Sequence, residues 1–152
     1  MNEKDMLQQL FEMQTKLNDL VSSNKNLTDN TGATLTMATL LKQGASGEPL
    51  GPNSEVNEWL HKYLIAMEDE SRELKQELLW KWWSKDSLDM QNIRVEIIDL
   101  LHFWISLAMV SGMTADDVFR LYQQKSQVNF KRQEKGYSRA TKDHSDNLSV
   151  NL

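Results

Sequence analysis

The chain has no cysteine among its 152 residues, which excludes a disulfide framework, a thiolate nucleophile and a cysteine-based zinc site. Only two prolines and six glycines interrupt it, and this scarcity favours long helices over a β-fold with many turns. A chain of this length suits one domain with a sizeable core.

A basic surface and a membrane segment are lacking as well. The net charge of −5 argues against a non-specific nucleic-acid-binding protein. It leaves a polyphosphate ligand open, because a bound metal ion can invert the local field. The longest apolar run, residues 100–110, contains His102 and Ser106 and is too short to span a bilayer. The N-terminus leads into an amphipathic pattern and not into a signal peptide, so we expect a cytoplasmic protein.

Apolar residues recur at helical spacing in four segments, so the sequence predicts an all-α fold, a bundle of four to five helices. The expected helices span about residues 3–23, 54–83, 90–111 and 115–134. Ser54 is a candidate N-cap, and Thr114 with Asp117 resembles a capping box.

Glycine and proline gather in one connection. Residues 24–54 hold four of the six glycines and both prolines, so we expect a long loop with a short helix near residues 35–42. We place the domain at residues 1–137, and we expect the polar tail at 138–152 to be loose.

Two pairs of carboxylates are the most informative feature. Glu96 and Asp99 share one face of the most apolar expected helix, and Glu70 and Glu73 form a matching pair on the helix before it. Burying unpaired carboxylates is costly, so positive charge must meet them. Oxygen ligands suit Mg²⁺, and the two pairs together indicate a magnesium cage. The alternative is a solvated acidic face, or ion pairs with arginines such as Arg72.

The last expected helix carries a complementary face. Its members lie at i, i+4, i+7 and i+8: Lys125, Asn129, Arg132 and Gln133. Two cations and two amides suit a polyphosphate, which arginine binds bidentately and lysine as a point charge. The alternative is a solvated basic strip near a helix C-terminus, where the helix dipole favours cations.

Four blocks, in order, resemble the dimeric dUTPases. The segments 70–73, 80–83 and 94–103 look like that family's ExxE…ExxD signature, and residues 125–137 resemble its KNxxNxxRQxxGY ending, with Ser126 where Asn is usual. Residues 14–19 resemble the segment that meets the base. These enzymes belong to a wider all-α group that includes MazG-like enzymes and phage dCTP/dUTP pyrophosphatases. The resemblance covers about residues 6–137, apart from the loop at 24–54.

The resemblance implies a homodimeric enzyme that hydrolyses dUTP to dUMP and pyrophosphate. It implies about two or more Mg²⁺ ions per site on the four carboxylates, which are Glu70, Glu73, Glu96 and Asp99. Glu73 is the candidate base for the attacking water. The implied contacts to the triphosphate are Lys125, Asn129, Arg132, Gln133 and Tyr137. The implied contacts to the nucleoside are Gln14, Asn18, Trp80, His102 and Phe103.

The sequence leaves the base open. Uracil offers an N3–H donor and an O4 acceptor, cytosine reverses both, and a freely rotating amide of Gln14 or Asn18 satisfies either. We expect dUTP, with dCTP, dual specificity or a broader MazG-like substrate range as the alternative. For His102, Phe103 and Trp80 the alternative is core packing.

Assembly and catalysis have competing interpretations too. A helical regulatory dimer without turnover is less favoured, because a scaffold needs no carboxylate cage on its most apolar helix. That helix is apolar around most of its circumference, and five tryptophans add further apolar surface. We therefore expect a homodimer, whereas a tetramer would point towards the MazG-like enzymes.

Overall fold

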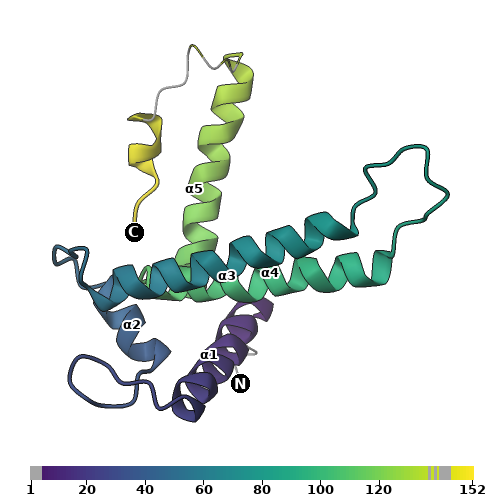
Figure 1. Cartoon of the computed structure of the whole chain (residues 1–152). Helices are drawn as coiled ribbons and strands as arrows, with labels where there is room; N and C mark the ends of the chain where they lie inside the picture. The colour runs from purple at the N-terminus through teal and green to yellow at the C-terminus, as the bar shows by residue number, and fades with distance from the viewer. Residues whose placement is uncertain (1–4, 137, 139, 141–144) are drawn as a thin grey trace. The chain divides into compact units, whose positions relative to one another are not determined.

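The computed structural model describes residues 5–136, 138, 140 and 145–152 (Figure 1). Within these residues the chain is 68% helical, with five α-helices and no strand, so the predicted all-α fold is confirmed. The elements in chain order are α1 (Met6–Asn24), α2 (Met37–Gly44), α3 (Glu55–Glu77), α4 (Met90–Val110), α5 (Ala115–Glu134) and the 3₁₀ helix η2 (Ser145–Ser149). The chain divides into two compact units, Met1–Met113 and Thr114–Leu152. None of the described helices is long and apolar enough to cross a membrane.

Side-chain caps explain where the helices begin. Every α-helix starts after a residue whose side chain accepts a hydrogen bond from the backbone N–H three positions later: Asp5, Thr36, Ser54, Asp89 and Thr114. The predicted caps at Ser54 and Thr114 are confirmed, and Asp117 completes the capping box of α5.

The end of α3 differs from the prediction. The sequence indicated a helix to residue 83, but α3 ends at Glu77, and Leu78 adopts an extended conformation. The tryptophans that follow bury little surface, since Trp80, Trp82 and Trp83 are 75%, 88% and 62% exposed. Without burial of an apolar face, helix propensity alone does not hold another turn. Residues 78–89 therefore form a connection to α4.

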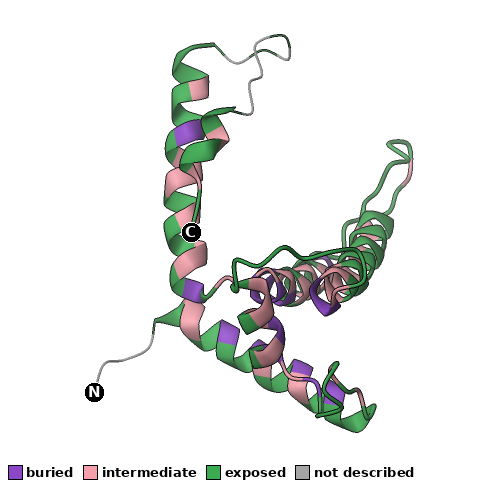
Figure 2. Cartoon of the chain, turned by 90° about the vertical axis from the view of Figure 1, so that its left-hand side faces the viewer, coloured by how far each residue is buried: buried purple, intermediate pink, exposed green. Residues whose placement is uncertain are grey.

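The core of the first unit lies around the C-terminal half of α4. α3 packs along α4, while α1 and α2 pack against α4 and against each other. Buried residues concentrate at Ile105, Ala108, Met109 and Val110. Figure 2 shows the chain coloured by burial, with buried positions on the helices in purple. The N-terminal half of α4 is more open, and apolar side chains such as Ile98 are exposed there. The expectation of a central, apolar helix holds for the C-terminal half of α4.

The connection between α1 and α3 is held by hydrogen bonds to α3 and by close packing on α4. The buried carboxylate of Glu55 accepts hydrogen bonds from the Asn30 backbone N–H at 2.9 Å and from Gln43 Nε2 at 2.7 Å. The short helix predicted at 35–42 is confirmed as α2. Its last residue, Gly44, lies so close to α4 that a Cβ would meet the Val110 carbonyl oxygen at 2.2 Å, so only glycine fits.

The second unit consists of α5 and the described part of the tail. η2 packs on α5, and the Asn151 backbone N–H donates to Gln124 Oε1 at 3.1 Å. The Asn151 carbonyl oxygen accepts a bond from the Arg120 guanidinium. Residues 145–149, which the sequence placed in a loose tail, are thus helical and in contact with α5.

Candidate active site

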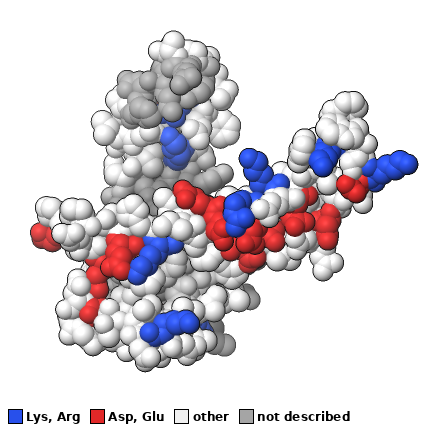
Figure 3. Space-filling view, viewed as in Figure 1, with Lys and Arg blue, Asp and Glu red and all other residues white. Residues whose placement is uncertain are grey.

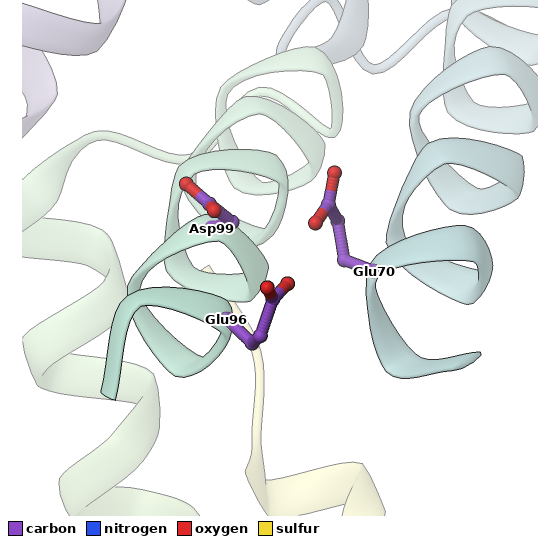
Figure 4. Close-up of side chains that lie close together, drawn as sticks. All are labelled: Glu70, Glu96 and Asp99. Atoms are coloured by element: carbon purple, nitrogen blue, oxygen red, sulfur yellow. The ribbon is translucent and has the colours of Figure 1, made fainter. Parts of the chain in front are cut away.

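Three of the four predicted carboxylates converge between two neighbouring helices. Glu70 extends from α3, and Glu96 and Asp99 extend from α4 (Figure 4). One oxygen of each lies within 4.8 Å of the others, and all three side chains are half-buried. The spacing explains this geometry, because residues three apart share a helix face and α3 packs along α4. Acidic side chains also gather over the surface of these helices in Figure 3.

The cluster is electrostatically strained. Partial burial raises the pKa of the Glu70 carboxyl, and the negative charges of Glu73, Asp99 and Glu96 raise it further. Burial likewise raises the pKa of Glu96, as do Glu73, Asp99 and Glu77. Like charges held together favour the protonated forms, and a bound cation would relieve this repulsion.

The alternative explanation by ion pairs finds no support in the described residues. Within them, no lysine or arginine forms a salt bridge with Glu70, Glu96 or Asp99. Arg72, named above as a candidate partner, pairs instead with Asp69 at 2.5 Å. Among the described residues, the cluster receives a long hydrogen bond from Asn92 Nδ2 to Glu96 Oε1 at 3.4 Å.

Glu73 lies beside this trio. Its side chain is exposed and it is outside the 4.8 Å group, yet its charge raises the pKa of both Glu70 and Glu96. The structure therefore distinguishes three converging carboxylates from a fourth, more solvated one.

A cavity of about 570 Å³ opens beside the carboxylates. Six residues predicted for the site line it: Gln14, Asn18, Glu70, Asp99, His102 and Phe103. The first unit thus brings four of the five residues predicted for the nucleoside, and two of the carboxylates, to one cavity. A concave site of this size with few convergent polar groups is typical of a small-ligand site.

Two aromatic residues of the cavity were missed from the sequence. Tyr63 lies between Trp59 and Phe103, with ring centroids at 5.5 Å and 6.4 Å. Burial raises the pKa of Tyr63 to about 12, with help from the charge of Asp19. Tyr63 precedes Glu70 by seven residues and follows Trp59 by four, so helical spacing alone could have placed both on the carboxylate face.

Three polar residues that line the cavity belong to a hydrogen-bonded chain of four, whose fourth member is Ser106. Ser106 Oγ donates to the His102 carbonyl oxygen at 3.0 Å, and Asn18 Nδ2 donates to Ser106 Oγ at 2.9 Å. Gln14 Nε2 donates to Asn18 Oδ1 at 2.9 Å, and Gln14 Oε1 lies 2.6 Å from His102 Nδ1. Gln14, Asn18 and Ser106 are buried. Ser106 was not among the predicted site residues.

Trp80 is not brought to this cavity. It lies in the connection after α3, with its ring edge-on to Trp83 at 6.0 Å and Lys81 Nζ 5.3 Å from its centroid. Its contact with the nucleoside stays a prediction from the resemblance.

The second unit holds the predicted phosphate contacts. Arg132 donates through Nε and Nη2 to both carboxylate oxygens of Asp146, at 2.7 Å and 2.6 Å. Lys125 Nζ donates to Asn147 Oδ1. The Arg132 hydrogen bonds and the charges of Arg132 and Lys125 lower the pKa of the Asp146 carboxyl. Both cations predicted to bind the phosphates, Lys125 and Arg132, are therefore engaged by the tail.

The amides of α5 lie apart from that contact. Asn129 and Gln133 line a small pocket of about 170 Å³ together with Ser126, the residue that departs from the family pattern. Tyr137, predicted to bind the triphosphate, lies outside the described residues.

Comparison with known proteins agrees with these features. A family model described as dUTPase matches residues 6–111, which include the three carboxylates and the polar chain. The chain belongs to this family. Two curated relatives are named dCTP pyrophosphatase. The one from Enterobacteria phage LZ5 is 28% identical over 90% of this chain and 86% of its own length. The one from Enterobacteria phage T4 is 25% identical over 90% and 85%. No solved structure matches the chain significantly.

These matches support the class of enzyme predicted from the sequence, a nucleoside triphosphate pyrophosphohydrolase. The family and the relatives are named after different bases, so they do not select between uracil and cytosine.

Proposed function

We propose that this protein hydrolyses dUTP to dUMP and pyrophosphate in a Mg²⁺-dependent reaction. The observation that carries the proposal is the convergence of Glu70, Glu96 and Asp99 beside a cavity walled by amides and aromatic rings. A deoxynucleoside triphosphate requires both features, because its phosphates need countercharge and its base needs hydrogen bonds and stacking.

The carboxylates fit magnesium by their chemistry. Mg²⁺ takes oxygen ligands, and three carboxylate oxygens within 4.8 Å of one another, without a protein cation paired to them among the described residues, provide such a set. Glu70, Glu96 and Asp99 would hold the ions, about two or more per site in the family, with Glu73 at the margin. Bound Mg²⁺ would supply positive charge against the phosphate oxygens.

The remaining roles belong to the protein's own groups. We assign to Glu73 the part of general base, since its exposed carboxylate can accept a proton from the attacking water while its neighbours hold cations. Hydrolysis then breaks a P–O bond of the bridge between the α- and β-phosphates. We assign the polyphosphate to Lys125, Asn129, Arg132, Gln133 and Tyr137.

The nucleoside would occupy the cavity. His102 and Asp99 are assigned to the deoxyribose, Phe103 to stacking on the base, and Gln14 and Asn18 to its polar edge. The contact of Phe103 with Tyr63, which in turn contacts Trp59, supports this assignment, because it holds the Phe103 ring beside the cavity within an aromatic cluster.

dCTP is the second candidate substrate. It is favoured by the two relatives named dCTP pyrophosphatase, whose alignments cover most of both chains. The family model favours dUTP. The presence of amides at the base edge does not by itself select a pyrimidine, because every amide has both a donor and an acceptor.

Release of pyrophosphate from each deoxynucleoside triphosphate, with Mg²⁺ and with a chelator, tests the proposal. We expect dUTP to be the best substrate, dCTP the next, and purine nucleotides poor, with no turnover in the chelator. Absence of pyrophosphate from every nucleotide at saturating Mg²⁺ would refute the enzymatic function. Faster hydrolysis of dCTP than of dUTP would select the second candidate.

We also propose that the protein is a homodimer. Apolar residues of α1 and α4 line an open groove of about 410 Å³, among them Leu10, Met13, Leu17 and Ile98, which are exposed. An apolar surface of this kind favours a self-complementary interface. Light scattering at micromolar concentration is expected to give twice the 17.6 kDa chain mass, and a clean monomer would contradict the proposal.

A further inference from the structure

We propose that Ser106 is a positioning residue that locks the amides of Asn18 and Gln14 in one orientation and so sets the cavity's preference between uracil and cytosine. The inference rests on the proposed function, because it concerns the base of that substrate. Ser106 is fully buried, at 0% exposure, and does not line the cavity, so it acts through Asn18.

The direction of the first two bonds follows from Ser106 itself. The His102 carbonyl oxygen can only accept, so the single hydroxyl proton of Ser106 points to it. The Ser106 oxygen can then only accept from Asn18 on the other side. The atom that Asn18 presents to it must therefore be the nitrogen Nδ2, and the 2.9 Å contact is Nδ2–H···Oγ.

The rest of the chain follows from that choice. With Nδ2 turned to Ser106, Asn18 presents Oδ1 to Gln14, and Gln14 must answer with Nε2–H. Gln14 Oε1 is then left facing His102 Nδ1 at 2.6 Å, and that nitrogen must carry a proton. One hydroxyl thus determines the orientation of two amides and one histidine tautomer.

Reversal of either amide is disfavoured by burial. Rotation of the Asn18 amide would place Oδ1 against the Ser106 oxygen, which has no second proton, and Nδ2 against Gln14 Nε2. Asn18 and Gln14 are buried, and no buried side-chain nitrogen or oxygen among the described residues lacks a partner. A buried donor or acceptor left unmatched disfavours the reversed state by about tenfold to a hundredfold.

The locked chain bears directly on the base. Uracil and cytosine exchange donor and acceptor at positions 3 and 4, and an amide that rotates freely accepts both. An amide that cannot rotate presents one donor and one acceptor in fixed places. This fixed pattern is complementary to only one of the two pyrimidines. A site built around one hydrogen-bonding pattern rejects the reversed pattern strongly.

The first test needs neither turnover nor ligand. In ¹⁵N-labelled protein at about pH 8, imidazole nitrogen shifts report the tautomer of each of the three histidines. We expect His102 to carry its proton on Nδ1, and we expect Ser106→Ala to populate the Nε2–H tautomer. The matched control is Ser111→Ala, which removes a hydroxyl bonded to the Ala108 carbonyl at 2.7 Å, outside the chain of four. A wild-type His102 protonated on Nε2 alone would overturn the inference.

The second test measures selectivity by binding of the monophosphates dUMP and dCMP, titrated by calorimetry. We expect the wild type to prefer one of them by at least about tenfold, and Ser106→Ala to reduce that ratio by about tenfold. Ser111→Ala should keep the ratio, and far-UV circular dichroism checks that both variants remain folded. General loosening of the cavity would weaken both ligands alike and leave their ratio unchanged.

The outcomes separate the two proposals. Equal affinities for dUMP and dCMP in the wild type, or an unchanged ratio in Ser106→Ala, would overturn the role of Ser106. Absence of pyrophosphate release from any nucleotide would refute the proposed activity, while the tautomer and the binding ratio would still test the locked chain.

Discussion

The two charged regions of this protein differ in how their charge is balanced. The carboxylates of α3 and α4 converge on one another, and the pKa of Glu70 and Glu96 is raised by that proximity. The two cations of α5 that we assign to the polyphosphate are engaged by the tail, Arg132 by Asp146 and Lys125 by Asn147. The carboxylates of the first region thus repel one another, whereas the second region contains a carboxylate where we propose a phosphate. Repelling carboxylates and paired cations should respond oppositely to mutation and to pH: removing a charge should stabilise the first region and destabilise the second.

The largest effect is expected from the acidic region. Asp99→Ala should reduce pyrophosphate release by at least about a hundredfold, since even outer-shell partners of a metal ligand contribute ten- to a hundredfold. The metal-free variant should melt at the same temperature as the wild type or higher, because one of several repelling charges is gone. Activity assays and thermal unfolding in chelator measure both.

The control for Asp99 is Glu68→Gln, which removes an exposed acid from the same pair of helices. It should change neither activity nor melting temperature. Near-normal activity of Asp99→Ala at saturating Mg²⁺ would remove Asp99 from the metal site and weaken the contrast between the regions.

The basic region should show a smaller loss of activity. Arg132→Ala is expected to lower kcat/KM by about tenfold to a hundredfold, because a charge-assisted hydrogen bond contributes about 1.5–3 kcal/mol. It should also lower the melting temperature slightly, since the ion pair between the half-buried Arg132 and Asp146 is lost. Lys131→Ala, the neighbouring exposed cation, serves as the control. A loss of stability with kcat/KM retained would assign Arg132 to the tail contact alone.

Asp146 offers a smaller effect of opposite sign on binding. If the Asp146 carboxylate competes with the triphosphate for Arg132, Asp146→Asn should lower KM for the nucleotide. The expected decrease is up to about fivefold, the range for loss of an ion pair near the surface. The kcat should stay unchanged, and Glu134→Gln, an exposed acid at the end of α5, controls for net charge. A raised KM would show that Asp146 supports the binding face and does not compete for it.

The parts of this picture that could be predicted are those with a local signal. Ser54 and Thr114 cap helices through bonds to residues three positions on, and the spacing of Glu96 and Asp99 places them on one face in any helix. The end of α3 could not be predicted so well, because residues 78–83 are rich in apolar side chains and their exposure depends on tertiary packing.

The role of Ser106 had no local signal. A serine that bonds to the carbonyl four residues before it is common in helices, and its second contact exists only because α1 places Asn18 against α4. The same limit applies to Asp146, because its pairing with Arg132 depends on the packing of η2 against α5. In both cases the decisive contact joins residues far apart in the sequence.

The smallest effect sharpens the comparison most, because the two regions should respond to pH with opposite signs. Glu70 and Glu96 have folded-state pKa values above their ordinary value of 4.5, so the folded protein binds protons more tightly than the unfolded one. Stability of the metal-free protein should therefore rise as pH falls from neutral through these raised pKa values towards about 4.5. Asp146 has a folded-state pKa below its ordinary 3.8, so its contribution to stability is present above that value and is lost as pH falls further.

Thermal unfolding in chelator from pH 7.5 to 3 separates the acidic contribution from that of Asp146 (the pH range follows from the ordinary carboxyl values). Glu96→Gln should be more stable than the wild type at neutral pH, with the difference vanishing near pH 4.5, while Asp146→Asn should be less stable until the lowest pH. A Glu96→Gln variant that is destabilised at neutral pH would mean that Glu96 has a stabilising partner, and the contrast between a strained acidic region and a satisfied basic one would fail.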